Sequence, residues 1–176
     1  DDVIVDAVAF TDGWFPEDED EKKLDPGVGF VCFSKLHEAP VCGLGSVAKE
    51  QMAEWLPRKN QIALVELFAA VQWVATCGPV LAGKQVILFV DSEAVEGALV
   101  KGASSKDDVG SLVVLFWKLV QFYRIVVYID RVSTDANISD GCSRGSTKLS
   151  KELGWVELDL VDPLGWGRMW VGPGQS

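Results

Sequence analysis

The order of the apolar segments restricts the fold more than any other feature of this sequence. Three strand-like runs come first, and helical and strand-like runs then alternate. Strands with short connections pair antiparallel, whereas parallel strands need a long crossover, usually a helix. The sequence therefore predicts an α/β protein. Its five-stranded mixed sheet has three antiparallel strands followed by parallel strands, with flanking helices.

The expected elements follow from apolar periodicity and from turn residues. Strands are predicted at residues 3–11, 28–33, 41–47, 85–91 and 124–132. Helices are predicted at about 60–76, 93–100 and 107–122, and a loop leads into a short helix within 137–144. Residues 48–58 look irregular, and Cys77-Gly78-Pro79 is expected to end the first helix.

Length and composition predict one main domain. The chain has 176 residues, of which 48% are hydrophobic, enough for a sizeable core. Residues 1–145 are expected to form the domain, and 146–176 a Gly- and Trp-rich C-terminal extension. The chain starts with Asp-Asp-Val and lacks a signal-peptide pattern and a long apolar span. We therefore expect an intracellular domain of a longer or processed chain, without a membrane partner.

The cysteines and the single histidine do not form a zinc motif. Cys32, Cys42, Cys77 and Cys142 are scattered without a CxxC pair, so buried thiols of a reducing compartment are expected. His37 lies in a loop-like stretch and is expected to be a surface or turn residue.

The net charge of −10 counts against nucleic-acid binding, because phosphate neutralisation usually requires a basic face. Residues 17–21 are five consecutive acids, a pattern typical of a solvated loop, and without them the net charge is −5. The acidity weakens a nucleic-acid function without excluding it.

Four acidic residues occur where the surrounding sequence predicts burial. Asp12 and Asp91 close apolar strands, Glu66 lies within an apolar helix, and Asp140 follows the last strand. A buried carboxylate is costly unless it is compensated. A shared divalent cation would compensate all four, and hard ions such as Mg²⁺ take oxygen ligands.

These segments together resemble the ribonuclease H-like superfamily, and most of all the ribonuclease H domain of a retroelement reverse transcriptase. The similarity covers about residues 3–145. It rests on Thr11-Asp12-Gly13, on Ile62 to Leu67 with Ala69, on Val90-Asp91-Ser92, and on Asn137-Ile-Ser-Asp140 with Ser143-Arg144. Two features depart from cellular ribonucleases H. The loop 133–136 lacks their histidine, as retroelement versions often do, and no basic helical protrusion is visible.

The resemblance implies a metal-dependent endonuclease that hydrolyses the RNA strand of RNA–DNA hybrids with two Mg²⁺ ions, or alternatively Mn²⁺. Asp12 would bridge both ions, Asp140 would complete the site that activates water, and Glu66 with Asp91 would hold the other ion. A reverse transcriptase polymerase domain in the same polyprotein is the implied partner.

Candidate substrate contacts come from the same motifs and from basic residues. Gly13 would let the backbone approach a phosphate closely. The contact residues expected are Gly13, Arg58, Lys59, Ser92, Asn137 and Arg144, and further phosphate contacts are Lys101, Lys106, Arg131 and Lys148.

Structural interpretations remain open for most of these residues. Asp12-Gly13 is also an ordinary turn, and Asp91 or Asp140 could cap a helix. Glu66 is the hardest to explain structurally, because its own helix offers no partner. The apolar helix and the tryptophans are expected in the core. Trp14 and Trp55 would be base-stacking candidates if exposed.

Two other functions remain as alternatives. A non-catalytic ribonuclease H-like module for assembly or nucleic-acid tethering would fit the acidic surface, but the four acids count against it. Other nucleases of the superfamily fit less well. The related exonucleases place Asp-x-Glu in the first strand, unlike residues 11–14. Integrase-like enzymes use a late Glu in a helix after the last strand.

Overall fold

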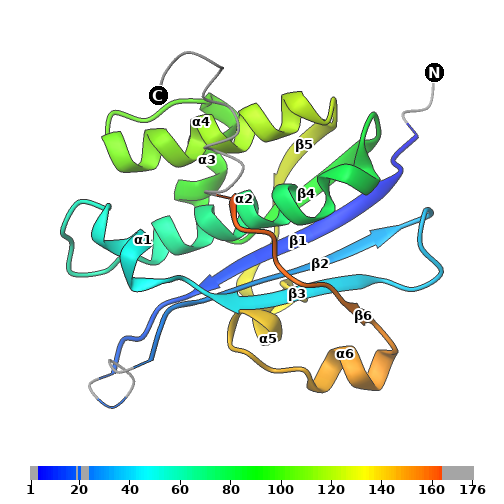
Figure 1. Cartoon of the computed structure of the whole chain (residues 1–176), viewed down its shortest axis with the longest axis horizontal. Coiled ribbons are helices and arrows are strands. Elements are labelled where there is room, and N and C mark those ends of the chain that lie inside the picture. The colour runs from blue at the N-terminus through cyan, green and yellow to red at the C-terminus, as the bar shows by residue number, and fades with distance from the viewer. Residues whose placement is uncertain (1–3, 19, 21–23, 164–176) are drawn as a thin grey trace.

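The computed structural model describes residues 4–18, 20 and 24–163, which form a mixed sheet of six strands (Figure 1). The strands are β1 (Ala7–Trp14), β2 (Gly27–Ser34), β3 (Val41–Ser46), β4 (Gln85–Val90), β5 (Val126–Arg131) and β6 (Val156–Glu157). Their order is β5-β4-β1-β2-β3-β6. The first three strands pair antiparallel, and β4 and β5 continue the sheet in parallel from β1. The predicted mixed α/β sheet is confirmed, with one strand more than expected.

The additional strand, β6, lies within the C-terminal extension. It pairs parallel with β3 over only two residues, too few to show a period in the sequence. The backbone N–H of Leu158 extends the pairing by donating to the carbonyl of Cys42 (2.8 Å). Part of the segment 146–163 thus belongs to the sheet, and the domain boundary at 145 stays a prediction. The rest of the Trp-rich tail lies outside the described residues.

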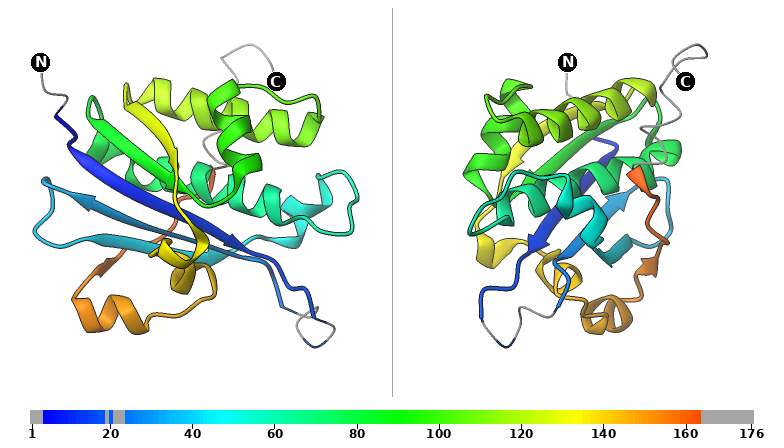
Figure 2. Two further views of the ribbon diagram at one scale, coloured as in Figure 1. Left: turned by 180° about the vertical axis from the view of Figure 1, so that it is seen from behind. Right: turned by 60° about the vertical axis from the view of Figure 1, so that its left-hand side comes forward.

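Helices cover both faces of the sheet (Figure 2). On one face, α2 (Ile62–Leu81) packs against β1 and β2, and α4 (Asp107–Phe122) packs against α2. On the other face, α5 (Asp140–Ser143) packs against β2 and β1, next to α6 (Lys148–Leu153). The remaining elements are α1 (Lys49–Ala53), α3 (Glu93–Lys101) and a 3₁₀ turn at Thr134–Ala136.

Two helical segments differ from the prediction. α1 occupies residues that were expected to be irregular, because one helical turn is too short to show periodicity. α2 continues through Gly78 and Pro79 to Leu81 instead of ending at residue 76. A Cβ at Gly78 would collide with the ring of Tyr123, so glycine permits this close contact. Packing against Tyr123 overrides the local stop signal.

α2 is the central helix of the core. Its side chains from Leu64 to Ala75 are almost all buried, and Trp73 is completely enclosed. Among the described helices, α2 has the length and composition of a membrane span, yet 78% of that window is buried within the fold. We therefore interpret α2 as a core helix.

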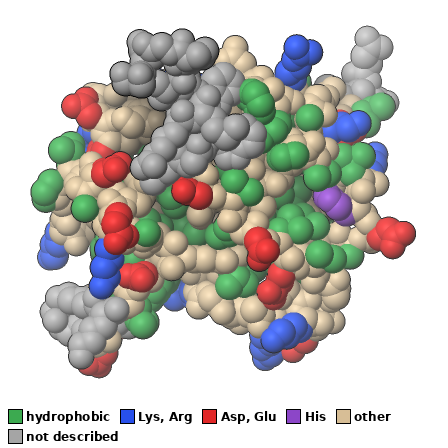
Figure 3. Space-filling view, in the orientation of Figure 1, with side chains coloured by type: hydrophobic (Ala, Val, Ile, Leu, Met, Phe, Trp, Pro, Cys, Tyr) green, Lys and Arg blue, Asp and Glu red, His purple; other side chains and the backbone are tan. Residues whose placement is uncertain are grey.

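The cysteines and His37 lie where the sequence predicts. All four cysteines are free and buried. His37 lies in the turn after β2, where its backbone N–H donates to the carbonyl of Ser34 (3.3 Å). Acidic and basic side chains are interspersed on the face shown in Figure 3, so the described residues form no continuous basic patch there.

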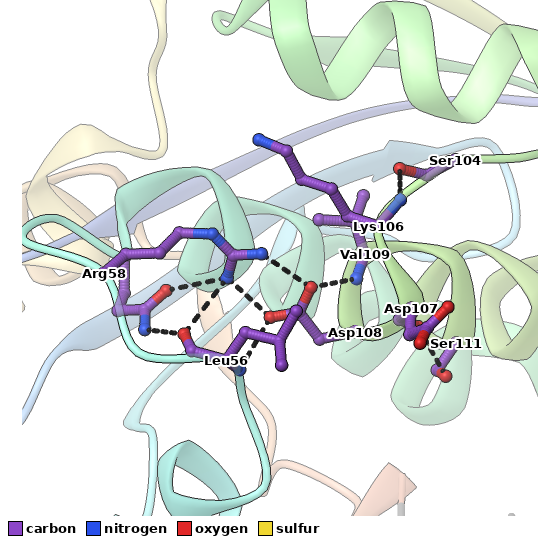
Figure 4. A network of polar contacts seen from close by, with 9 residues as sticks. Leu56, Arg58, Ser104, Lys106, Asp107, Asp108, Val109 and Ser111 are labelled. Atoms are coloured by element: carbon purple, nitrogen blue, oxygen red, sulfur yellow. Dashed lines mark hydrogen bonds and ion pairs between the residues drawn. The ribbon is translucent and has the colours of Figure 1, made fainter.

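A charged contact fastens the loop before α2 to the start of α4 (Figure 4). The guanidinium of Arg58 donates to both carboxylate oxygens of Asp108 (2.5 and 2.7 Å), and the backbone N–H of Leu56 donates to the same carboxylate (2.9 Å). The Asp108 side chain is only 4% exposed. The contact with Arg58 holds the pKa of Asp108 well below its usual range. Arg58 therefore has a structural role, and its predicted substrate contact stays a prediction.

Replacing Asp108 by Asn should destabilise the protein by about 1–2 kcal/mol at pH 7, because a charge-assisted bond is lost at a partly exposed Arg58. Since the native pKa of Asp108 lies below the unfolded value of 3.8, the contact stabilises fully above that pH and weakens on acidification. Urea unfolding at pH 7 and pH 3 measures the effect. An equal difference between wild type and variant at both pH values would contradict it.

Candidate active site

Three acidic side chains converge at the end of the central strands. Asp12 lies near the end of β1, and Asp91 directly follows the neighbouring parallel strand β4. Glu66 lies in the second turn of α2, which packs over β1. Because β1 and β4 run in the same direction, their carboxyl ends open at the same edge of the sheet.

Gly13 brings α2 close enough to complete this group. A Cβ at residue 13 would lie 2.6 Å from the backbone nitrogen of Glu66 and 2.8 Å from its Cα, which is too close for any side chain. The main chains of β1 and α2 therefore touch beside the acids. Gly13 has a packing role here in addition to the phosphate approach suggested by the sequence.

The carboxylates of Asp12, Glu66 and Asp91 lie within metal-binding distance of one another. One oxygen from each residue lies within 4.8 Å of the other two. All three line a cavity of about 390 Å³ that Asp140 and Arg144 also line. Asp140, the first residue of α5, is outside this group of three, and its carboxylate pairs with Arg144 at the end of the same helix (3.2 Å).

Burial and mutual repulsion make Asp12 and Glu66 hard to ionise. Asp12 is only 5% exposed, and desolvation, with repulsion from Asp91, raises its pKa to about 7. Desolvation and the charges of Asp91 and Asp12 raise the pKa of Glu66 to about 8. Asp12 and Glu66 therefore ionise fully at neutral pH only when a cation offsets the charge of the cluster. Hard oxygen ligands with uncompensated charge fit a divalent cation such as Mg²⁺.

Polar side chains hold the acids in place. The hydroxyl of Ser143 lies 2.8 Å from Asp12 Oδ2 and 2.8 Å from the carbonyl oxygen of Asp140, which links β1 to α5. The buried amide of Asn137 donates to the carbonyl of Thr11 (3.1 Å) and accepts from the backbone of Ser139 (3.1 Å). Asn137 therefore supports the end of β1, although the sequence suggested a substrate contact.

The other predicted contacts are dispersed. Ser92 caps α3 by accepting from the backbone N–H of Val95 (3.3 Å), and it adjoins Asp91. Lys59 lines another cavity, which adjoins the acidic one at Phe15 and Glu17. Arg131 pairs with Glu93 (3.4 Å). Of the predicted substrate contacts, only Gly13 and Arg144 line the acidic cavity.

Part of the cavity wall was not predicted from the sequence, namely Phe15, Glu17, Asp18 and Thr134. Ile62 of the helical motif and Trp14, a stacking candidate in the sequence, line the cavity too. The acidic run was interpreted as a solvated loop. Its start only five residues after Asp12 was the available signal that Glu17 and Asp18 lie at the site, because the chain leaves the end of β1 there. With these two acids, six described carboxylates surround the cavity and Arg144 is the described cation.

Comparisons with known proteins identify the fold. No family model and no curated protein matches the sequence. Three solved structures match with TM-scores of 0.54, 0.56 and 0.51 and identities of 17%, 16% and 13%. They are RNase H1 of the archaeon Halobacterium salinarum, the N-terminal RNase H domain of a Mycobacterium tuberculosis protein, and LC11-RNase H1 isolated from compost. The alignments cover 80%, 85% and 81% of this chain and 98% of each of those chains.

At such identities the similarity establishes the fold alone. The strand order, the parallel continuation from β1 to β5 and the helices on both faces agree with it. The resemblance to the ribonuclease H-like superfamily is confirmed at this level, and the retroelement origin stays a prediction. The chain therefore has the ribonuclease H-like fold.

Proposed function

We propose that this protein is a metal-dependent ribonuclease H that hydrolyses the RNA strand of RNA–DNA hybrids. The observation that carries the proposal is the convergence of Asp12, Glu66 and Asp91 from three elements to within 4.8 Å. Such a group would be destabilising without a cation, and it lies where sheets of this kind hold their sites. The fold shared with structures named RNase H1 supports the same conclusion.

The group of three carboxylates fits a divalent cation, and we propose that, with Asp140, it holds two Mg²⁺ or Mn²⁺ ions. Asp12 would contact both ions, with Glu66 and Asp91 on one side and Asp140 on the other. Bound ions of this kind lower the pKa of water and stabilise the charge that develops on phosphate. The chain itself fixes the ligands, since Ser143 orients Asp12 and the backbone at Gly13 sets the distance to Glu66.

RNA would be distinguished from DNA by its 2′-hydroxyl groups. Glu66 and the backbone near Gly13 line the cavity where such a group would lie. We also propose an intracellular location. A reverse transcriptase polymerase domain is the proposed partner, because an acidic domain binds a polyanionic hybrid weakly and a neighbouring domain could hold the hybrid in place. Glu17 and Asp18 beside the site favour the second candidate, a non-catalytic assembly or tethering module.

Cleavage of a labelled RNA–DNA hybrid in Mg²⁺ and in Mn²⁺ tests the proposal. We expect hybrid cleavage by the wild type, no cleavage of single-stranded RNA or double-stranded DNA, and loss of activity in Asp91→Asn. Asp159→Asn is the matched control, because Asp159 is an exposed acid that lines a different cavity. If the hybrid stays intact in both metals, also with a polymerase domain added, the non-catalytic module is the better explanation.

A further inference from the structure

A second cavity adjoins the acidic one. It has a volume of about 420 Å³, and Trp14 and Arg144 line both cavities. The two spaces therefore meet at these side chains. A polynucleotide whose phosphate lies at the carboxylates would place a neighbouring nucleotide in the second space.

The two cavities differ in charge. Six described acids line the first, whereas Asp25 is the described acid of the second. Arg144 contributes a cation, and Leu24 and Leu44 contribute apolar surface. The second cavity therefore repels a polyanion less strongly than the first, and its apolar side chains can contact a nucleobase.

The side chain of Trp14 forms part of the wall of the second cavity. Its cross-strand partner is Gly27 on β2, which has no side chain, and the main chain of Ser143 lies over Gly27 instead. Trp14 is partly exposed, unlike Trp55 and Trp73, which are buried. Gly45 and Gly145 also line the cavity, so their backbone forms part of its wall.

The size and chemistry suit one nucleotide. Small-molecule sites span roughly 300–1,000 Å³, and a single nucleotide fits at the lower end of that range. Aromatic side chains bind bases by stacking, and arginine binds phosphate through its planar guanidinium. The side chain of Arg144 is 57% exposed. It can therefore contact a phosphate group on the solvent side while it also pairs with Asp140.

We propose that this cavity is a nucleotide subsite, in which Trp14 stacks on the base next to the cleaved bond and Arg144 contacts a phosphate. The proposal rests on the proposed function, since it assumes that a polynucleotide lies across the acids. Trp14 would thus determine affinity rather than the chemical step.

A hybrid carrying 2-aminopurine in an unpaired position tests the stacking directly, because an unpaired 2-aminopurine is fluorescent and is quenched when it stacks on an aromatic side chain. The base is placed in turn on either side of the cleaved bond, with Ca²⁺ replacing Mg²⁺ to prevent cleavage. We expect quenching at one position by the wild type, little by Trp14→Ala, and partial quenching by Trp14→Phe. Hybrid affinity should fall about 10-fold in Trp14→Ala. Arg144→Ala should reduce the salt dependence of binding by about one phosphate contact.

Tyr128→Ala is the control, because Tyr128 is an exposed aromatic residue on β5. Circular dichroism establishes that each variant is folded. If Trp14→Ala binds and quenches like the wild type, the subsite is wrong even when the hybrid is cleaved in Mg²⁺. If the wild type quenches in a Trp14-dependent way but never cleaves, the subsite stands and the proposed activity fails.

Discussion

Replacing Asp12 by Asn is expected to reduce hybrid cleavage by a factor on the order of 10³ or more. Asp12 is the most buried of the three converging acids and the one that Ser143 holds in place. Asparagine has nearly the same shape, so the fold should remain. Its neutral amide is a far weaker ligand for a hard cation than a carboxylate. Initial rates at saturating metal measure the loss.

The control is again Asp159→Asn, which should cleave at the wild-type rate. Metal binding by calorimetry separates the causes, because Asp12→Asn should lose measurable Mg²⁺ affinity while its circular dichroism is unchanged. Retention of more than about a tenth of the activity would show that Asp12 does not contact the catalytic ions.

Replacing Glu66 by Gln should stabilise the metal-free protein at pH 8. The native pKa of Glu66 is about 8 against a reference value of 4.5, so the folded state holds this proton more tightly than the unfolded chain. At about 1.4 kcal/mol per pKa unit, ionised Glu66 costs up to roughly 5 kcal/mol. Water at the cavity mouth screens part of this, so we expect a gain of about 2–3 kcal/mol, or roughly 5–10 °C in the melting temperature.

The pH dependence gives the sign of this effect. Below pH 4.5 Glu66 is protonated in both states, and the variant and wild type should melt alike. As the pH rises from 4.5 to 8, the unfolded chain releases the proton first, so the wild type loses stability and the difference grows. Above pH 8 the difference should stay constant.

Added Mg²⁺ should reverse the order at pH 8, because a cation that binds only the folded wild type stabilises it. Glu152→Gln serves as the control, since Glu152 is exposed on α6 and should show no such pattern. Thermal melts with EDTA and with Mg²⁺ provide both readings. If Glu66→Gln melts below the wild type in EDTA at pH 8, ionised Glu66 does not destabilise the metal-free protein and this explanation is wrong.

Strong local patterns made the topology and the converging acids predictable. Asp12 and Asp91 terminate apolar strands, and Glu66 interrupts an apolar helix, so each departs visibly from its surroundings. β6 and α1 were missed, because two to five residues cannot show a period. The end of α2 was misplaced, because the contact between Gly78 and Tyr123 is not visible in local sequence.

The roles of individual polar residues were less predictable. Arg58 was expected to contact substrate, but its partner Asp108 is distant in sequence. The approach of Glu17 and Asp18 to the site depends on the path of the loop after β1. Such pairings are decided by the assembled fold rather than by neighbouring residues.

The two glycine contacts of α2 have a consequence for how this protein tolerates change. Near one end, the helix touches the main chain at Gly13, and near the other Gly78 rests on Tyr123. At about 1.5 Å per residue, Glu66 and Gly78 lie some 18 Å apart along the helix axis. These two close contacts fix the position of α2 near both of its ends. Conservative substitutions of core residues between them can therefore be accommodated by local repacking. Substitutions in the core would then leave the position of Glu66 relative to Asp12 unchanged, provided that both glycines are kept.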